Sequence, residues 1–258
     1  MSSSSGNFVW YELMTTDPAA AERFYTRVVG WTAADAGMPG MKYTLLSAGG
    51  HQIAGMMALP PEAGGMPPCW TGYVAVDDVD AKAAEIATAG GSVLHLPDDI
   101  PGVGRFAVVA DPQGASFCIF KGLMQAGEAL PPQPSQEMPG AVGWHELNAG
   151  ALDAAWGFYS RVFGWTRDQA IDMGPAGTYQ LFAVRGQAKG GMMNKPPGMP
   201  VPNWQFYFNV EAIDAAVARV GAGGGKVING PMEVPGGSWI VNAVDPQGAM
   251  FALVAPRR

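Results

Sequence analysis

Two glutamates in apolar surroundings are the side chains of this sequence best suited to chemistry. Glu12 follows Trp10 by two positions, and Glu146 follows Trp144 by two positions, 134 residues later. Desolvation in an apolar strand is expected to raise the pKa of a carboxyl group, which could then remove a proton as a general base. The alternative is that each carboxylate accepts hydrogen bonds from backbone or tyrosine and only orders the core.

The constant offset extends far beyond the two glutamates. Trp70 has its counterpart at Trp204, and the Asp-Pro-Gln-Gly-Ala sequence at 111–115 recurs at 245–249. A period this long exceeds the roughly 20–50 residues of solenoid repeats. The chain is therefore expected to be a tandem duplication of a whole domain, so that every functional residue is sought twice.

The repeated segments predict an α+β fold built from four β-α-β-β-β units. In the first unit, residues 8–14 read as a strand, and Asp17-Pro18 is a typical helix start. The apolar residues that follow recur at helical spacing up to Gly30, and glycines separate three short strands near 31–35, 42–48 and 52–58. A second unit is expected from residue 70, with strands near 92–95, 105–110 and 116–121.

Strand alternation assigns the side chains that share a face with each glutamate. The expected pockets combine indole, phenol and carboxylate groups with apolar walls, which is typical of small-molecule sites. Tyr73 and Tyr207 are the proposed hydrogen-bond donors to the glutamates, whereas Tyr43 and Tyr179 are interpreted as core or mouth residues. The predicted ligand-binding residues are Trp10, Met57, Thr71, Tyr73, Cys118 and Phe120 in the first copy and Trp144, Met193, Gln205 and Tyr207 in the second.

These motifs together resemble the vicinal-oxygen-chelate superfamily, which includes glyoxalase I, extradiol dioxygenases and bleomycin-resistance proteins. The similarity rests on the helix ending Phe-Tyr, the Gly-Trp that follows it, and the Asp-Pro-x-Gly turn, and it is greatest to tandem glyoxalase-like or hydroxylase-like proteins. The resemblance implies two paired-sheet glyoxalase-like domains in tandem. We expect them at 7–122 and 141–256, joined by a proline-rich linker at 123–140.

The resemblance also implies a metal in each cavity, but the matching positions hold unsuitable residues. Indole and alanine give no lone pair to a divalent ion. The matching positions are Trp10, Thr71 and Cys118 in the first copy, Trp144, Gln205 and Ala252 in the second, and a fourth position near Gly55 and Gly191. His51, His95 and His145 are not repeated between the copies. We therefore expect no metal and no cofactor, and we interpret the histidines as surface or core residues.

Composition narrows the class of protein further. The 258 residues carry a net charge of −7, without the basic stretches that nucleic-acid binding favours. The sequence shows neither a secretory signal nor an apolar stretch of about 18 residues that could span a membrane. Cys69 and Cys118 have no counterparts in the other copy. These features predict a cytoplasmic protein without nucleic-acid or membrane partners.

Three functions remain open on these grounds. The first is binding of a small, largely apolar or aromatic molecule in a metal-poor cavity of each domain. The second is a glyoxalase-type lyase or hydroxylase-like enzyme that uses Glu12 or Glu146 as base, or a metal held by other residues. The third is a structural or interaction protein with vestigial pockets. A monomer with internal pseudo-symmetry and a homodimer are both compatible with the duplication.

Overall fold

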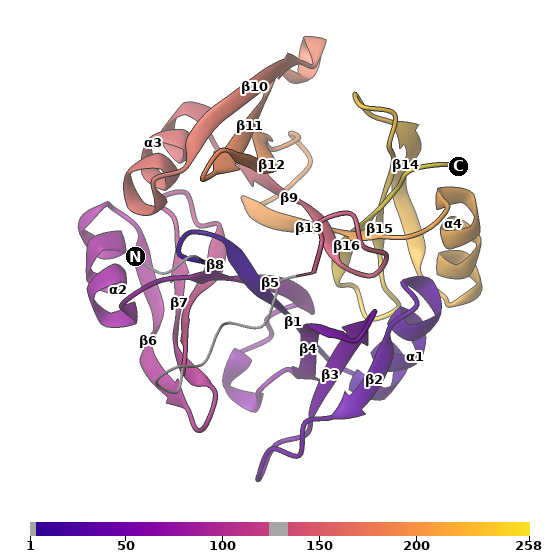
Figure 1. Ribbon diagram of the computed structural model, residues 1–258, viewed down its shortest axis with the longest axis horizontal. Coiled ribbons are helices and arrows are strands. Elements are labelled where there is room, and N and C mark those ends of the chain that lie inside the picture. The colour runs from indigo at the N-terminus through magenta and orange to yellow at the C-terminus, as the bar shows by residue number, and fades with distance from the viewer. Residues whose placement is uncertain (1–3, 124–133) are drawn as a thin grey trace. The chain divides into compact units, whose positions relative to one another are not determined.

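The computed structural model describes residues 4–123 and 134–258, and within them the chain adopts the predicted α+β fold. Each of four β-α-β-β-β units contributes one helix to this part of the chain (Figure 1). The helices are α1 (Pro18–Val28), α2 (Val79–Thr88), α3 (Leu152–Phe163) and α4 (Ile213–Ala222), and the 3-10 turns are Pro61–Ala63 and Gly174–Ala176. No helix of the described residues is long and apolar enough to cross a membrane.

The strands form two mixed eight-stranded sheets, one from each half of the sequence. The orders are β2-β3-β4-β1-β5-β8-β7-β6 and β10-β11-β12-β9-β13-β16-β15-β14. In both sheets, the first strand of each unit pairs in parallel with the last strand of that unit. The first sheet comprises β1 (Phe8–Thr15), β2 (Thr32–Asp35), β3 (Tyr43–Ala48), β4 (His51–Ala58), β5 (Cys69–Ala75), β6 (Ser92–Ile100), β7 (Gly104–Ala110) and β8 (Ser116–Gly122). The second comprises β9 (Val142–Ala149), β10 (Thr166–Asp172), β11 (Thr178–Val184), β12 (Gln187–Asn194), β13 (Asn203–Asn209), β14 (Lys226–Glu233), β15 (Trp239–Val244) and β16 (Met250–Ala255).

The first helix forms for the reasons that its sequence gives. Asp17 accepts a hydrogen bond from the Ala20 amide at 3.0 Å, which satisfies one of the amides that an α-helix leaves unpaired at its start. Pro18 occupies the first turn, where its missing N–H costs nothing. The buried face of α1 carries Phe24 and Tyr25, so the helix is fixed to the core by the two aromatic residues of the repeated motif.

Strand β6 extends beyond the predicted range of 92–95 to Ile100. It lies at the edge of its sheet, and its pairing with β7 is irregular between His95 and Asp98. An edge strand tolerates Pro97 because one side of its backbone needs no partner strand. The proline therefore coincides with a bulge in the strand and does not end it.

Residue contacts divide the chain into two compact units, each of which combines a segment of the first half with a segment of the second. One unit contains α1, β2, β3 and β4 together with α4, β14, β15 and β16. The other contains α2, β6, β7 and β8 together with α3, β10, β11 and β12. The domain boundaries 7–122 and 141–256 stay a prediction.

A buried tyrosine joins the two segments in the unit that contains α1. The Tyr25 hydroxyl donates to Oδ2 of Asp245 at 3.1 Å and accepts from the Trp70 indole at 2.9 Å. Oδ1 of Asp245 accepts from the backbone amides of Gln247 and Ala249, so this aspartate also holds its own turn. The helix of one segment is thereby bonded to a turn of the other.

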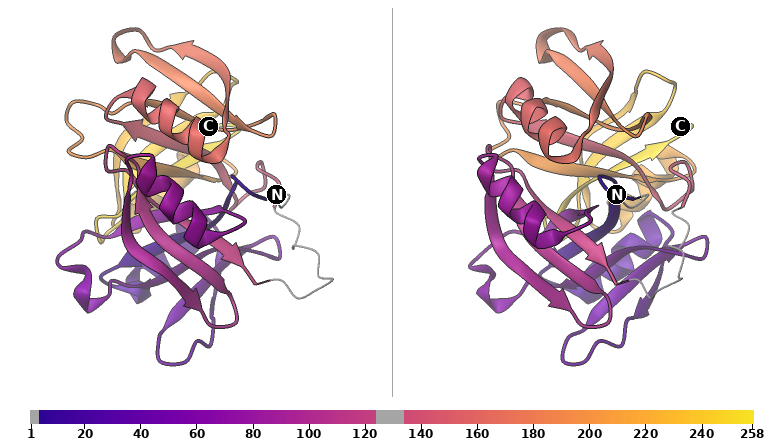
Figure 2. Two further views of the ribbon diagram at one scale, coloured as in Figure 1. Left: turned by 90° about the vertical axis from the view of Figure 1, so that its left-hand side faces the viewer. Right: turned by 60° about the vertical axis from the view of Figure 1, so that its left-hand side comes forward.

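The unit that contains α2 repeats this arrangement with the matching residues of the sequence repeat. Tyr159 donates to Oδ2 of Asp111 at 3.2 Å and accepts from Trp204 at 3.0 Å. Within this unit, α2 lies along β6 and β7 (Figure 2). The sequence alone does not reveal that Tyr25 and Tyr159 bond to an aspartate of the other half, because these partners are 220 and 48 residues away.

Residues 134–140, the described end of the predicted linker, are bonded to β13. The Asn209 side chain donates to the carbonyls of Gln136 and Met138, and the Trp31 indole donates to the Gly140 carbonyl at 2.7 Å. Trp165 makes the same bond to Gly6. The rest of the linker, residues 124–133, lies outside the described residues.

Candidate functional site

Glu12 is part of a hydrogen-bonded cluster with two aromatic residues. Its Oε2 accepts from the Tyr43 hydroxyl at 2.8 Å, and the Tyr43 oxygen accepts from the Trp10 indole at 3.0 Å. Glu12 is 9% exposed, and Trp10 and Tyr43 are half-buried. Trp10 and Glu12 therefore share one face of β1, as strand alternation predicts.

The cluster depends on a glycine in the neighbouring strand β4. Gly55 pairs with Glu12 across the parallel ladder, and Tyr43 extends over it from β3. A Cβ at this position would collide with the Tyr43 phenol. The missing side chain therefore provides the space from which Tyr43 reaches Glu12.

Cys69 lies close enough to respond to this carboxylate. Burial raises the pKa of the Cys69 thiol to about 11, and the negative charge of Glu12 adds to the shift. A thiol with so high a pKa is neutral at pH 7 and is a weak nucleophile. Cys69 is therefore a neighbour of the Glu12 cluster with little reactivity at pH 7.

The second copy builds the same pair in the other compact unit. The Tyr179 hydroxyl donates to Oε2 of Glu146 at 3.1 Å, and the ring of Tyr179 lies over Gly191, which pairs with Glu146. Recurrence of all three residues in the second copy, the glutamate at an offset of 134 and the tyrosine and glycine at 136, indicates that they belong together.

The donors in these pairs come from the third strand of the first and third β-α-β-β-β units, β3 and β11. The sequence predicts Tyr73 and Tyr207 as donors, whereas in the structure Tyr43 and Tyr179 donate to the two glutamates. The signal that could have identified them is their pairing in the repeat with Gly55 and Gly191, since a glycine opposite a tyrosine leaves room for its ring. The proposed bonds from Tyr73 and Tyr207 stay a prediction.

Four further predicted site residues gather on β5 and β8 of the unit that contains α2. Thr71 Oγ1 lies 3.9 Å from the Cys118 sulfur, and Tyr73 pairs with Cys118 across the parallel ladder. The Phe120 ring meets the Tyr73 ring edge-on, with centroids 6.1 Å apart. These strands therefore present a mostly apolar surface whose threonine and cysteine satisfy one another.

The corresponding strands of the second copy, β13 and β16, present a different surface. Gln205 stands in place of Thr71 and is 3% exposed, but its Nε2 has no hydrogen-bond partner in the structure. Ala252 stands in place of Cys118 and pairs with Tyr207. The predicted residues Trp144, Met57 and Met193 are half-buried, and their contact with a ligand stays a prediction.

The donor atoms of the first cluster do not fit a divalent metal ion. Tyr43 occupies one oxygen of Glu12, the Trp10 nitrogen carries a proton that it donates, and Gly55 has no side chain. Across the described ranges 4–123 and 134–258, no three His, Cys, Asp or Glu residues gather as a metal-binding group. The family-type metal positions therefore lack the imidazole and carboxylate set that such an ion requires.

His145 is a core residue whose side chain lies on the opposite face of β9 from Glu146. Its Nδ1 contacts the Lys189 carbonyl at 2.6 Å, and its ring stacks on Phe8 with centroids 4.5 Å apart. Since a carbonyl oxygen only accepts, Nδ1 carries the proton. Burial lowers the pKa of His145 to about 4, so the ring is neutral at pH 7.

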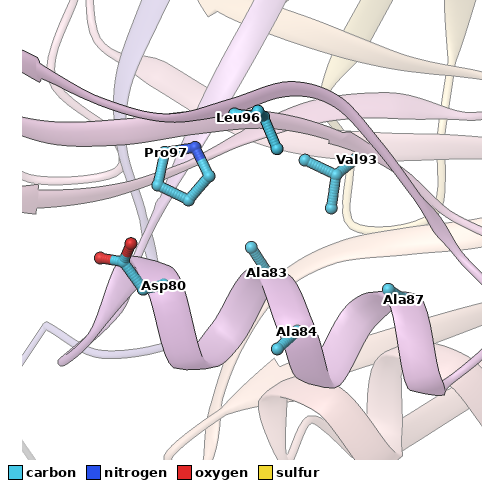
Figure 3. Close-up of a pocket in the computed structure, with 7 residues that line it drawn as sticks. All are labelled: Asp80, Ala83, Ala84, Ala87, Val93, Leu96 and Pro97. Carbon is cyan, nitrogen blue, oxygen red and sulfur yellow. The ribbon is translucent and has the colours of Figure 1, made fainter.

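Two hollows lie outside the predicted site residues, both in the unit that contains α2. One, of about 250 Å³, is an apolar groove between α2 and β6, with three alanines on one side and Val93, Leu96 and Pro97 on the other (Figure 3). Its charged residue, Asp80, is bonded to Arg105. The other, of about 240 Å³, lies at the end of α3, where Lys82 bonds to Glu85 and to the Val162 carbonyl.

Comparison with known proteins assigns both halves of the chain to one family description. The model of the Glyoxalase/Bleomycin resistance protein/Dioxygenase superfamily matches residues 7–119 and 141–253. The two matches begin at the same point of the repeat and together cover most of the chain.

Two similar proteins span nearly the whole chain. "Putative glyoxylase CFP32" of Mycobacterium bovis is 36% identical over 251 residues, which cover 96% of this chain and 94% of the relative. "Anthracycline biosynthesis protein DauV" of a Streptomyces species is 36% identical over 264 residues, which cover 96% and 92%.

Solved structures share the fold at much lower identity. The Mn(II)-bound glyoxalase of Novosphingobium aromaticivorans is 18% identical, with a TM-score of 0.64, and the match covers 96% of this chain and 81% of that one. Homoprotocatechuate 2,3-dioxygenase of Brevibacterium fuscum is 15% identical, with a TM-score of 0.67, covering 96% and 79%. At these identities the likeness concerns the fold alone.

Proposed function

The chain belongs to the Glyoxalase/Bleomycin resistance protein/Dioxygenase superfamily, and on that premise we propose that it binds a small, largely apolar or aromatic molecule. The glutamate–tyrosine pairs at Glu12 and Glu146 are the polar anchors of this binding. The half-buried indole of Trp10 supplies an aromatic wall beside the first pair.

The hydrogen-bonded cluster of Trp10, Tyr43 and Glu12 is the observation that carries this proposal. A few polar groups held in place among apolar side chains are typical of sites that orient an aromatic ligand. The same pair at Glu146 and Tyr179 supports a function that was kept through the duplication.

Titration with a fused aromatic quinone tests the proposal. Because one relative bears the name of an anthracycline biosynthesis protein, alizarin red S, a soluble dihydroxyanthraquinone sulfonate whose phenolic hydroxyls can donate to a carboxylate, is a suitable probe. We expect saturable quenching of tryptophan fluorescence, and at least about tenfold weaker binding in the double variant Glu12→Gln/Glu146→Gln, because a hydrogen bond from a hydroxyl to a charged carboxylate is about twice as strong as one to a neutral amide.

The amide variants also separate function from structure. Glutamine keeps the shape of glutamate and one acceptor oxygen, so the fold is expected to survive. If the variants melt at a lower temperature yet bind the quinone as tightly as the parent, the glutamates are structural and the proposal is wrong.

A glyoxalase-type enzyme is the second candidate, and the name of the mycobacterial relative favours it. In that case Glu12 or Glu146 removes a proton from the carbon next to a substrate carbonyl, and the phenol of the pair holds the carboxyl group in place. Turnover of methylglyoxal hemithioacetal that disappears in Glu12→Gln/Glu146→Gln would support this candidate. Binding of the quinone without any turnover would favour the first.

We further propose that the protein works in the cytoplasm, as a monomer or homodimer, without nucleic-acid or membrane partners. Its acidic net charge of −7 and two free cysteines support this setting.

A further inference from the structure

We infer that Gln205 makes the surface of β13 and β16 selective for ligands that carry a hydrogen-bond acceptor such as a carbonyl, whereas the matching surface of β5 and β8, which carries Thr71, lacks this selectivity. The inference rests on the proposed ligand-binding function and concerns the chemistry of the ligand. It assigns different preferences to two surfaces that occupy matching positions of the repeat.

The side-chain amide of Gln205 is the polar group that points to such a ligand. The residue is 3% exposed, and its Nε2 finds no acceptor in the structure. Gln205 and Tyr207 are two positions apart on β13 and therefore share a face. The amide thus stands on the side of β13 where strand alternation places the ligand-binding residues.

The duplication explains why this amide has no partner. In the first copy, Thr71 lies 3.9 Å from the sulfur of Cys118, so that the two side chains satisfy one another. In the second copy, Ala252 takes the place of Cys118 and pairs with Tyr207 in the same register. The methyl group of alanine can neither donate nor accept, so replacement of the cysteine leaves the amide without its local partner.

A ligand with an acceptor would remove the energetic cost of this arrangement. A buried donor without a partner is destabilising, and sites built around such a donor discriminate strongly against analogues that cannot accept its hydrogen bond. An apolar ligand of the same shape would leave Nε2 unpaired. The surface of β13 and β16 should therefore prefer the ligand with the acceptor, and the surface of β5 and β8 should bind both about equally.

A matched pair of probes tests this directly. Anthraquinone-2-sulfonate and anthracene-2-sulfonate share their ring system and charge and differ in the two quinone carbonyls. We would titrate both into the full chain by calorimetry and resolve the two sites. We expect one site to prefer the quinone by about tenfold, the equivalent of one buried hydrogen bond, and the other site to show a ratio near one.

Two substitutions assign the selective site. Gln205→Met keeps the length of the side chain and removes its donor, so the tenfold preference should disappear while the anthracene affinity remains. Thr71→Val is the matched control in the first copy and should leave the preference unchanged. Thermal unfolding of each variant confirms that its fold is intact.

Each outcome decides the inference. A preference that persists in Gln205→Met overturns it, as does a preference lost in Thr71→Val, because a bound water or another residue would then satisfy the amide or choose the ligand. If both probes bind with the same affinity at both sites, the inference fails and the proposed function stands. If neither probe binds, both fail.

Discussion

At the scale of single residues, the site is defined as much by an absent side chain as by those present. Tyr43 reaches Glu12 because Gly55 has no Cβ, and Tyr179 reaches Glu146 over Gly191 in the same way. The tyrosine, the glycine and the glutamate lie on three adjacent strands. A substitution at the glycine should therefore remove the hydrogen bond to the carboxylate without removing a polar side chain.

We expect Gly55→Ala to separate Tyr43 from Glu12. The added Cβ would collide with the phenol, so the ring must move and the hydrogen bond to Glu12 must break. The expected loss of stability is about 1–3 kcal/mol, typical of overpacking, together with weaker binding of alizarin red S. Thermal unfolding and fluorescence titration measure these two effects.

Gly157→Ala is the matched control for this substitution. Gly157 is exposed within α3, and a Cβ there would meet no atom within 4 Å. Because alanine favours helix over glycine by about 1 kcal/mol, this variant should be more stable and should bind the probe normally. Unchanged binding in both variants would show that Tyr43 has no role in the site.

The glutamates stand out in the sequence as single residues, whereas their partners are signalled only by a tyrosine and a glycine that recur together, at 43 and 55 and at 179 and 191. A carboxylate repeated in an apolar strand can be recognised in the sequence, and strand alternation correctly places Trp10 on the face of Glu12. The identity of Tyr43 as donor depends on the register of β3 and β4, which brings a ring over Gly55. The unpaired amide of Gln205 likewise becomes visible only when its neighbours are known.

His145 predicts a pH dependence of stability that is specific to the second copy, since Tyr11 stands at its place in the first. Burial lowers the pKa of His145 to about 4 from 6.5, and the partly buried cation of Lys189 acts in the same direction. The folded state thus favours the neutral ring. The neutral His145 ring therefore contributes to folding stability, and this contribution is fully present above about pH 6.5. As the pH falls towards 4 the contribution, which is up to about 3 kcal/mol, is lost.

Chemical denaturation at pH 7 and pH 5 measures this dependence. In His145→Asn, the amide can still donate to the Lys189 carbonyl but does not titrate. The loss of stability between the two pH values should therefore be smaller in the variant than in the parent. An equal loss in both proteins would mean that His145 is protonated in the folded state without cost.

At the scale of elements, the helices are held by side chains from other segments of the chain. Lys82 of α2 donates to the Val162 carbonyl near the end of α3, and Arg219 of α4 donates to the Val28 carbonyl at the end of α1. Val28 and Val162 are counterparts in the repeat, but the two cations stand at different positions of their helices. A cation at a helix C-terminus is favoured by the helix dipole.

At the start of α3, a side chain from another segment takes the place of the missing N-cap side chain. Its N-cap residue is Ala151, which has no capping side chain, and Gln113 of the turn after β7 bonds to both the amide and the carbonyl of Ala151. The α1 helix has its own cap in Asp17, and Oε1 of Gln247, the counterpart of Gln113, is buried without a partner among the described residues.

We therefore expect opposite effects from the same substitution at these two positions. Gln113→Ala should destabilise the protein by about 1–2 kcal/mol, as loss of a helix cap does. Gln247→Ala should be neutral or slightly stabilising, because it removes an unsatisfied buried acceptor. Urea denaturation of the two variants checks this. Equal losses would show that the cap at Ala151 does not contribute to stability.

The order of helices and strands could be read from the sequence, whereas several ends could not. Caps such as Asp17 and the repeated glycines mark where helices begin and end. The length of β6 was hidden by Pro97, which normally argues against a strand and is tolerated here by its edge position.

At the scale of the whole molecule, each compact unit needs a segment from both halves of the chain. Tyr25 of the first half bonds to Asp245 of the second, and Tyr159 of the second bonds to Asp111 of the first. The pairing of segments is invisible in the repeat itself, because Tyr25 has an equivalent aspartate in its own half. Only the contacts show which aspartate it uses.

This exchange predicts the behaviour of the first half when it is produced alone. A chain of residues 1–123 carries both Tyr25 and Asp111. Their partners in the full chain, Asp245 and Tyr159, lie in the second half and are missing from this chain. Because Asp111 is the counterpart of Asp245, two copies can restore both bonds by joining Tyr25 of one to Asp111 of the other. We therefore expect a symmetric homodimer, which light scattering after size-exclusion chromatography would detect.

Tyr25→Phe in the half-length chain makes the test specific. It keeps the buried ring and removes the hydroxyl that donates to the aspartate and accepts from the Trp70 indole. Because the aspartate and the indole then lose a buried partner, the dissociation constant of the dimer should be at least about tenfold higher in the variant than in the unsubstituted half-length chain. The control Thr88→Val changes the end of α2, where the hydroxyl bonds only to the Ala84 carbonyl of its own helix, and should leave the dimer intact. A folded monomeric half would show that each half satisfies its own core and that the exchange of segments is not required for stability.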